Sequence, residues 1–241
     1  MTARRFLSSD WLLCFVRPLA AGLAAASVST AALAAATSVF ESSAGSGFLL
    51  GTAQSAGSVT DKTSIFGNLR DGRGGNTPNF VDLFKFSANR DGNYFFNTIG
   101  AFGSTIADPA LFLFDAAGNG LYWNNDVSLS PADTESGFVQ SLFVGDYYLG
   151  VAFYGAEAYS GLDAIFDTLV SNQGSASTGV GALDNWQNFS TFSNIWDVSG
   201  YQVDIKVPEP SALALAGLAL GLMGWTSRRR VQGFRGSGSP A

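Results

Sequence analysis

The segments between Phe80 and Gly155 alternate apolar and polar residues, and this alternation constrains the fold more than any other feature of the chain. In "FVDLFKFSA", Phe84 and Phe86 share one face of an extended strand and Lys85 and Ser87 share the other, because successive side chains point to opposite faces. The turn residues "NRDGN" then lead into "YFFNTIG", which predicts a hairpin. One face of each strand must cover a core.

Further segments repeat this pattern along the chain. "ALFLFD" is apolar on both faces, as expected for the central strand of a sandwich, and "AAGNG" turns it into "LYWNND". "GFVQSLF" and a turn at Gly145-Asp146 precede "YYLGVAF", and "YQVDIKV" has the form of a last strand. In these last two segments the predicted core-facing residues are Tyr147, Leu149, Val151, Phe153, Tyr201, Val203, Ile205 and Val207. We expect an all-β, antiparallel β-sandwich over residues 80–206.

Residues 37–79 precede this domain and are rich in Ser, Gly and Ala. We expect them to form short strands and loops, with strands at the apolar patches Gly47–Thr52 and Ser64–Gly67.

The alternation stops over residues 158–198, which we expect to be an insertion. Its first part has the spacing of one short amphipathic helix, with Ser160 as the N-cap and Gly174 just beyond the end. The apolar residues on the predicted helix face are Leu162, Ile165, Phe166, Leu169 and Val170.

Four aromatic residues, Trp186, Phe189, Phe192 and Trp196, follow at intervals among polar residues. Aromatic side chains in a row can stack against sugar rings at a surface, or they can cover the edge of a core. The second interpretation is the commoner one in small β-domains.

Composition limits the chemistry of residues 37–206, which hold 17 acidic and six basic residues, a formal charge of −11. This charge repels phosphate backbones, so we expect no nucleic-acid partner. The chain contains no histidine, and its one cysteine, Cys14, lies near the N-terminus. Nucleophilic sites that need His, and histidine metal sites, are therefore excluded. The domain must be stable by packing alone, and 17 of the 20 Phe residues lie in it.

The N-terminal region is typical of a secretory signal. Arg4 and Arg5 precede an apolar, alanine-rich stretch that ends at Ala34 and Ala36, and small residues at these positions suit a signal peptidase. We expect residues 1–36 to form a signal helix that is cut after Ala36. A retained membrane anchor is the alternative.

The C-terminal region has three parts in a fixed order. "VPEP" comes first, and its prolines favour an extended backbone. Residues 211–226 are 16 uncharged residues, which as a helix would be about 24 Å long against a bilayer core of about 30 Å. Arg228, Arg229 and Arg230 then favour a cytoplasmic C-terminus. We expect a weak transmembrane helix and a cytoplasmic tail at 231–241.

This order of Val207, Pro208, Glu209, Pro210, apolar span and arginines resembles the PEP-CTERM sorting signal of Gram-negative bacteria over residues 207–230. The resemblance implies that an exosortase, a membrane protease or transpeptidase, recognises the motif. It also implies that the protein inserts transiently in the inner membrane and is then passed to the cell surface or an exopolysaccharide matrix, as in a biofilm.

The run Val81–Phe153 resembles bacterial pre-peptidase C-terminal domains through the strand at Asp82, "ADPALFLFDAAGNGL", "NND" and "GDYYLGV". The resemblance implies a jelly-roll-like sandwich. Some sandwiches of this type bind calcium, and the candidate oxygen ligands are Asp115, Asn124, Asn125 and Asp126. The alternative is that these side chains cap tight turns.

Together these features predict a non-catalytic structural or adhesive protein. An extracellular carbohydrate-binding module that uses Trp186 and Trp196 is the alternative. A glycosidase with paired carboxylates would be a third class, but a sequence cannot show such a pair.

Overall fold

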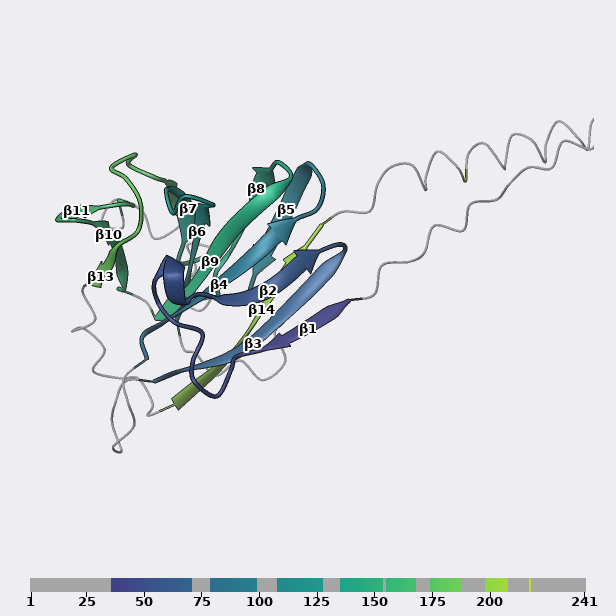
Figure 1. The fold of residues 1–241 in the computed structure, drawn as a ribbon, viewed down its shortest axis with the longest axis horizontal. Helices are drawn as coiled ribbons and strands as arrows, with labels where there is room; N and C mark the ends of the chain where they lie inside the picture. Colours follow the sequence, from purple (N-terminus) through teal and green to yellow (C-terminus); the bar gives the residue numbers. More distant parts are fainter. Residues whose placement is uncertain are drawn as a thin grey trace, which may run out of the picture. The chain divides into compact units, whose positions relative to one another are not determined.

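The computed structural model describes residues 36–70, 79–98, 108–127, 135–153, 155–167, 174–187 and 198–207, together with Gly217. These residues form two large β-sheets and one small sheet (Figure 1). The five-stranded sheet has the order β1-β3-β14-β5-β8, and the six-stranded sheet has the order β12-β7-β6-β9-β4-β2. The small sheet has the order β11-β10-β13.

The strands of the five-stranded sheet are β1 (Thr37–Phe40), β3 (Lys62–Arg70), β14 (Val198–Lys206), β5 (Gly92–Asn97) and β8 (Gly137–Leu142). Those of the six-stranded sheet are β12 (Ser175–Ala176), β7 (Gly120–Asn124), β6 (Pro109–Asp115), β9 (Gly145–Phe153), β4 (Val81–Ala88) and β2 (Gln54–Val59). The small sheet contains β11 (Asp163–Ala164), β10 (Glu157–Ser160) and β13 (Asn185–Gln187).

The main core lies between the two large sheets, and the predicted inward faces form it. Phe84 and Phe86 of β4 pack with Tyr94 and Phe96 of β5, and the Phe86 and Phe96 ring centroids are 5.8 Å apart. The inward residues of β9 and β14 belong to the same cluster: Leu149, Val151, Phe153, Tyr201, Val203 and Ile205. The predicted alternation of β4, β9 and β14 is therefore confirmed.

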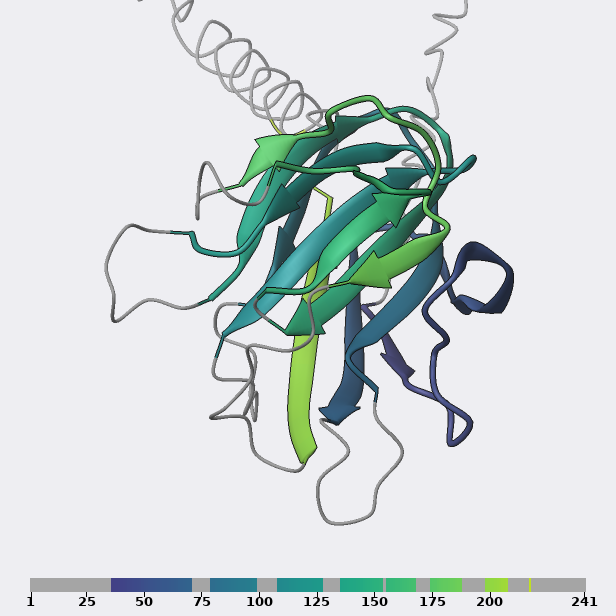
Figure 2. The same ribbon diagram turned by 90° about the vertical axis from the view of Figure 1, so that its left-hand side faces the viewer.

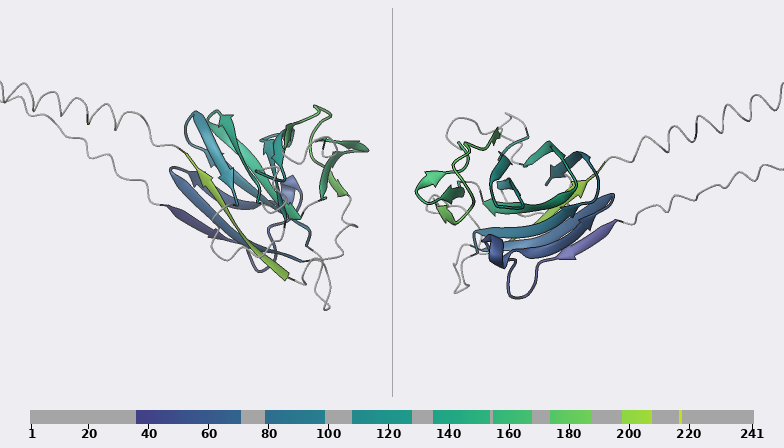
Figure 3. Two further views of the ribbon diagram at one scale, coloured as in Figure 1. Left: turned by 180° about the vertical axis from the view of Figure 1, so that it is seen from behind. Right: turned by 45° about the horizontal axis from the view of Figure 1, so that its top comes forward.

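A second core covers the other face of the six-stranded sheet, so that its central strands are buried on both sides (Figures 2 and 3). Phe112 and Phe114 of β6 contact Phe166 and Trp186 there. Residues 155–167 and 174–187 thus form a third layer. This burial explains why "ALFLFD" is apolar on both faces, because each face meets its own core.

The structure corrects two predicted connections. The hairpin predicted at "NRDGN" is wrong, since β4 lies in the six-stranded sheet and β5 in the five-stranded sheet. The antiparallel prediction holds for most pairs, but β1 pairs with β3 and β2 pairs with β4 in parallel. By contrast, the hairpin of β6 and β7 is confirmed, with Leu111 opposite Asn124.

The predicted helix between Ser160 and Gly174 is wrong over its described part. Ser160 belongs to β10, and the Ile165 amide donates to the Ala158 carbonyl oxygen at 2.9 Å. Leu162, predicted to be buried, is 90% exposed, whereas Ile165 and Phe166 are buried in the second core. Burial of these two residues in the second core, where the Phe166 ring contacts Phe112 and Phe114 of β6, outweighs the helical spacing of the apolar residues.

Within residues 37–79, the strands β1, β2 and β3 are an integral part of the sandwich. The predicted strand at Ser64–Gly67 is confirmed within β3, which pairs with β14 over nine residues. The strand predicted at Gly47–Thr52 is wrong, because Leu50–Thr52 form a short 3-10 turn.

Several predictions lie outside the described residues: the signal helix, Ala34, the prolines of the motif, Arg228, Arg229 and Arg230, the tail at 231–241, and Trp196. Ala36 is described and exposed, and Gly217 has helical backbone. The described part of the chain includes no helix long and apolar enough to span a membrane.

Candidate functional site

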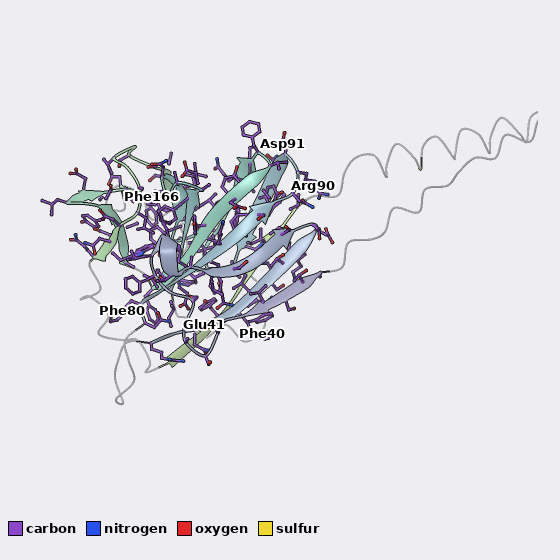
Figure 4. All side chains as sticks on the ribbon, in the orientation of Figure 1. Phe40, Glu41, Phe80, Arg90, Asp91 and Phe166 are labelled. Atoms are coloured by element: carbon purple, nitrogen blue, oxygen red, sulfur yellow. The ribbon has the colours of Figure 1, made fainter. Side chains whose placement is uncertain are left out.

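The end of β14 is held by two hydrogen bonds, one with another backbone group and one with a side chain. The Val207 amide donates to the Asp61 carbonyl oxygen at 2.8 Å, and the Arg90 guanidinium donates to the Val207 carbonyl oxygen at 3.3 Å. The Val207 side chain is 4% exposed and belongs to the main core. Figure 4 labels Arg90 beside Asp91, at the connection between β4 and β5. Val207 is thus held by the sandwich, and Pro208 is the next residue.

An ionic cluster lies on the outer face of the same strand. The Asp204 carboxylate is 2.9 Å from the Lys62 ammonium and 3.3 Å from the Lys206 ammonium. It also accepts hydrogen bonds from Ser64 and Gln202. Burial alone would raise the pKa of Asp204, but these four groups outweigh it and lower the pKa to about 2. The cluster joins β3 to the last strand through side chains.

A second buried carboxylate, Asp82 of β4, lies inside the sandwich. Its oxygens accept hydrogen bonds from Ser46 Oγ at 2.5 Å, Asn79 Nδ2 at 2.8 Å and Tyr201 Oη at 2.8 Å. Burial raises the pKa of Asp82, and the three donors act in the opposite direction. Gly67 makes room for the Tyr201 hydroxyl, since a Cβ atom there would lie 2.2 Å from Tyr201 Oη. With three donors, Asp82 fits a structural role.

The four residues predicted as calcium ligands do not all come together, because Asp115 lies apart from Asn124, Asn125 and Asp126. Asp115 lies at the β6–β7 turn, where it accepts hydrogen bonds from the amides of Ala117 and Asn119 at 2.9 Å. Asn124 pairs with Leu111, four residues along β6 from Asp115, which is about 14 Å in a strand. The turn-capping alternative therefore describes Asp115.

The structure instead brings Asp108 close to Asn125 and Asp126. Asp108 directly precedes β6, and Asn125 and Asp126 directly follow β7, so the antiparallel pair places them at one end of the sandwich. Asn125 Nδ2 donates to Asp126 Oδ2 at 3.2 Å. Burial, and then the charge of Asp126, raises the pKa of Asp108 to about 7, while a hydrogen bond from Asn125 opposes both effects.

Asp108 did not figure among the predicted ligands, although a signal for it existed. Counting back along β6 from the turn at Asp115–Asn119, Asp108 falls opposite the residues that directly follow β7.

The Trp186 side chain is buried rather than exposed at the surface. It is 6% exposed, its Nε1 donates to the Phe48 carbonyl oxygen at 2.7 Å, and its ring meets Phe112 edge-on at 5.1 Å. Trp186 therefore covers a core and does not offer a free face to a sugar.

Across the described ranges, no group of three or more Asp, Glu, His or Cys residues could hold a metal ion.

Comparison with known proteins gives one specific match. The family model of the PEP-CTERM protein-sorting motif matches residues 206–230, from the last residue of β14 onward. A search of curated proteins found no significant match.

Among solved structures, the chain is similar to the pre-peptidase C-terminal domain of collagenase from Bacillus anthracis. The identity is 12%, the match covers 64% of this chain and 93% of that chain, and the TM-score is 0.32. This TM-score is too low to establish a common fold. The chain carries a PEP-CTERM protein-sorting motif at residues 206–230, and this motif implies an exported protein that is sorted at its C-terminus and recognised by an exosortase.

Proposed function

We propose that the chain is a non-catalytic structural or adhesive protein of the cell surface or extracellular matrix of a Gram-negative bacterium. In this proposal signal peptidase cuts the chain after Ala36, the C-terminal helix holds it briefly in the inner membrane, and the exosortase removes the tail. The released sandwich then associates with exopolysaccharide.

The observation that carries the proposal is the position of the sorting motif relative to the fold. The family match begins at Lys206, and Val207, the last residue described before the motif's prolines, is anchored by the sandwich. Cleavage after this point would remove none of the described strands. The motif and the domain are therefore separable, as a sorting mechanism that discards the tail requires.

The non-catalytic part of the proposal is supported by composition and packing. The chain has no histidine, and its one cysteine lies in the predicted signal. The buried carboxylate Asp82 is surrounded by donors that stabilise it, rather than by groups that would activate it for chemistry.

A carbohydrate-binding module is not proposed as a second function. Its main described residue, Trp186, is buried in the second core.

The test is mass spectrometry of the protein recovered from the cell surface. We expect its last peptide to end between Lys206 and Pro210. A double variant, Pro208→Ala with Pro210→Ala, should stay in the membrane fraction with its C-terminus intact, because it loses the motif without touching a described strand. Pro240→Ala, in the same tail but outside the family match, is the control and should be processed normally. Surface protein that is intact through Ala241 would contradict the proposal.

A further inference from the structure

We propose that the tip of the β8–β9 turn, Phe143 and Val144, inserts into the periplasmic leaflet of the inner membrane while the C-terminal span is still attached. The partner of this apolar surface is therefore the lipid bilayer. The inference rests on the proposed function, because it requires the span at residues 211–226 to lie in the membrane. It adds a second membrane contact, which belongs to the folded domain.

The first observation is the exposure of two large apolar side chains that are neighbours in the chain. Phe143 is 76% exposed and Val144 is 65% exposed. They form the whole connection between β8 and β9. Apolar residues scattered singly over a surface need no explanation, whereas exposed apolar neighbours form a patch that a partner can bury.

The second observation is that two backbone groups of this turn already have partners within the sandwich. The Val144 amide donates to the Asp91 carboxylate at 2.8 Å, and the Tyr147 hydroxyl donates to the Phe143 carbonyl oxygen at 3.0 Å. A backbone polar group that loses water without gaining a partner is costly. A protein partner could supply its own donors and acceptors, but lipid chains cannot. A turn that satisfies these groups internally therefore fits a bilayer.

The third observation places this tip at the end of the sandwich from which the tail leaves. β8 and β14 both run antiparallel to β5, so they end on the same side of the sheet. Asp91, which holds the Val144 amide, directly follows Arg90, whose guanidinium donates to the Val207 carbonyl oxygen at 3.3 Å (Figure 4). A short series of contacts thus joins the tip to the last anchored residue.

The length of chain after Val207 limits how far this end can lie from the bilayer. Only Pro208, Glu209 and Pro210 separate Val207 from the uncharged span, which begins at Ser211. Four Cα–Cα steps cover at most about 14 Å, even in a fully extended chain. When the span is inserted, the end of the sandwich that carries the tip is therefore held close to the membrane surface.

The charge of this end also suits a membrane surface. The turns β2–β3, β4–β5 and β8–β9, their flanking strand residues and the last residue of β14 carry three basic and two acidic residues, a formal charge of +1: Lys62, Arg90, Lys206, Asp61 and Asp91. Residues 37–206 as a whole carry −11. An anionic bilayer surface repels the domain as a whole but not this end of it.

The test uses the full chain, reconstituted without exosortase in vesicles of phosphatidylethanolamine and phosphatidylglycerol. Cys14→Ser removes the one native cysteine, so that Phe143→Cys, Val144→Cys or Phe48→Cys can each carry an environment-sensitive fluorophore. We expect the labels at 143 and 144 to emit at shorter wavelength than the label at 48. They should also be quenched several-fold more strongly by nitroxide-labelled lipid and several-fold less by aqueous iodide.

Phe48→Cys is the matched control, because Phe48 is also exposed, at 56%, but lies away from this end. The carbonyl oxygen of the preceding residue, Gly47, accepts a hydrogen bond from the Leu83 amide at 2.8 Å. Leu83 is five residues along β4 from Ala88, where β4 ends, which is about 17 Å in a strand. The label at 48 should stay accessible to iodide.

Flotation of the vesicles tests the proposed function separately. If the wild-type chain does not float with the vesicles, the span does not insert, and both the proposed function and this inference fail. If the chain floats but the labels at 143 and 144 are as accessible to iodide as the label at 48, this inference alone is overturned.

Two further outcomes would also overturn it. Protection from iodide without quenching by nitroxide-labelled lipid would mean that another segment or a second copy of the chain covers the tip. Protection that develops only after exosortase is added to the vesicles would assign the tip to the protease.

Discussion

Tyr201→Phe tests whether the buried carboxylate of Asp82 depends on its hydrogen-bond donors. The substitution keeps the aromatic ring of Tyr201 in the main core and removes only the hydroxyl that donates to Asp82 Oδ2 at 2.8 Å. Asp82 is fully buried, so water cannot replace this donor without opening the sandwich.

The expected loss follows from the kind of hydrogen bond that is removed. A hydrogen bond to a charged group contributes about 1.5–3 kcal/mol to the free energy of unfolding. For a domain of this size each kcal/mol corresponds to about 2–4 °C, so Tm should fall by about 3–12 °C. Urea unfolding of the full chain, followed by circular dichroism, measures the loss directly.

The loss should also depend on pH, with a definite sign. The Tyr201 hydroxyl lowers the pKa of Asp82 against the effect of burial, so the variant should have a still higher folded-state pKa. When the pKa of a carboxyl group is higher in the folded protein than in the unfolded chain, stability is lost as pH rises through the folded-state pKa. The difference in stability between wild type and variant should therefore be larger at about pH 8 than at about pH 4.

Tyr94→Phe is the matched control. Tyr94 is also fully buried, but its hydroxyl donates to the neutral Arg90 carbonyl oxygen at 3.0 Å. Its removal should cost about 0.5–1.5 kcal/mol at both pH values. The role given to the donors of Asp82 is contradicted if the loss of stability in Tyr201→Phe does not depend on pH. It is also contradicted if this loss is no larger than that in Tyr94→Phe.

Two further predictions concern other parts of the structure. Trp186→Ala should lower the free energy of unfolding, measured in urea, by about 3–5 kcal/mol. Leu162→Ala, at a residue that is 90% exposed, should change it by less than about 0.5 kcal/mol. Similar losses in both variants would mean that the third layer is not packed as described. For Asp204, whose pKa is lowered to about 2, stability is present above its unfolded-chain pKa of 3.8 and is lost as pH falls toward 2. Solvent partly screens the ion pairs of Asp204, because both lysines are partly exposed, so Asp204→Asn should remove about 1–2 kcal/mol of this acid-induced loss of stability. An unchanged dependence of stability on pH in the acid range would contradict this role of Asp204.

The parts of the fold that were predictable depend on local patterns. The two-residue period of "FVDLFKFSA" and "YYLGVAF" identifies which side chains of β4 and β9 face the main core, and the turn after "ALFLFD" identifies the β6–β7 hairpin. Each pattern is complete within a few residues, and tertiary packing does not change it.

The parts that were not predictable depend on distant partners. The turn at "NRDGN" has the same local chemistry whether the chain returns in the same sheet or crosses to the opposite one. The spacing of Ile165 and Phe166 fits a helix, and only their burial in the second core shows that they do not form one. At the end of the β6–β7 pair, Asn125 and Asp126 stood out in the sequence, but Asp108 lies beside them only because of the register of β6 and β7.

The place of β14 in the sheet has a consequence for incomplete chains. β14 is the last of the described strands to be synthesised, yet it lies between β3 and β5 and pairs Lys206 with Lys62. Contacts between residues so far apart in sequence form slowly, and these contacts cannot form until β14 has been synthesised. A chain that stops before residue 198 lacks the strand that joins β3 to β5 and lacks the sorting motif as well. Therefore only a chain that extends through β14 and the sorting motif can both complete the five-stranded sheet and be sorted.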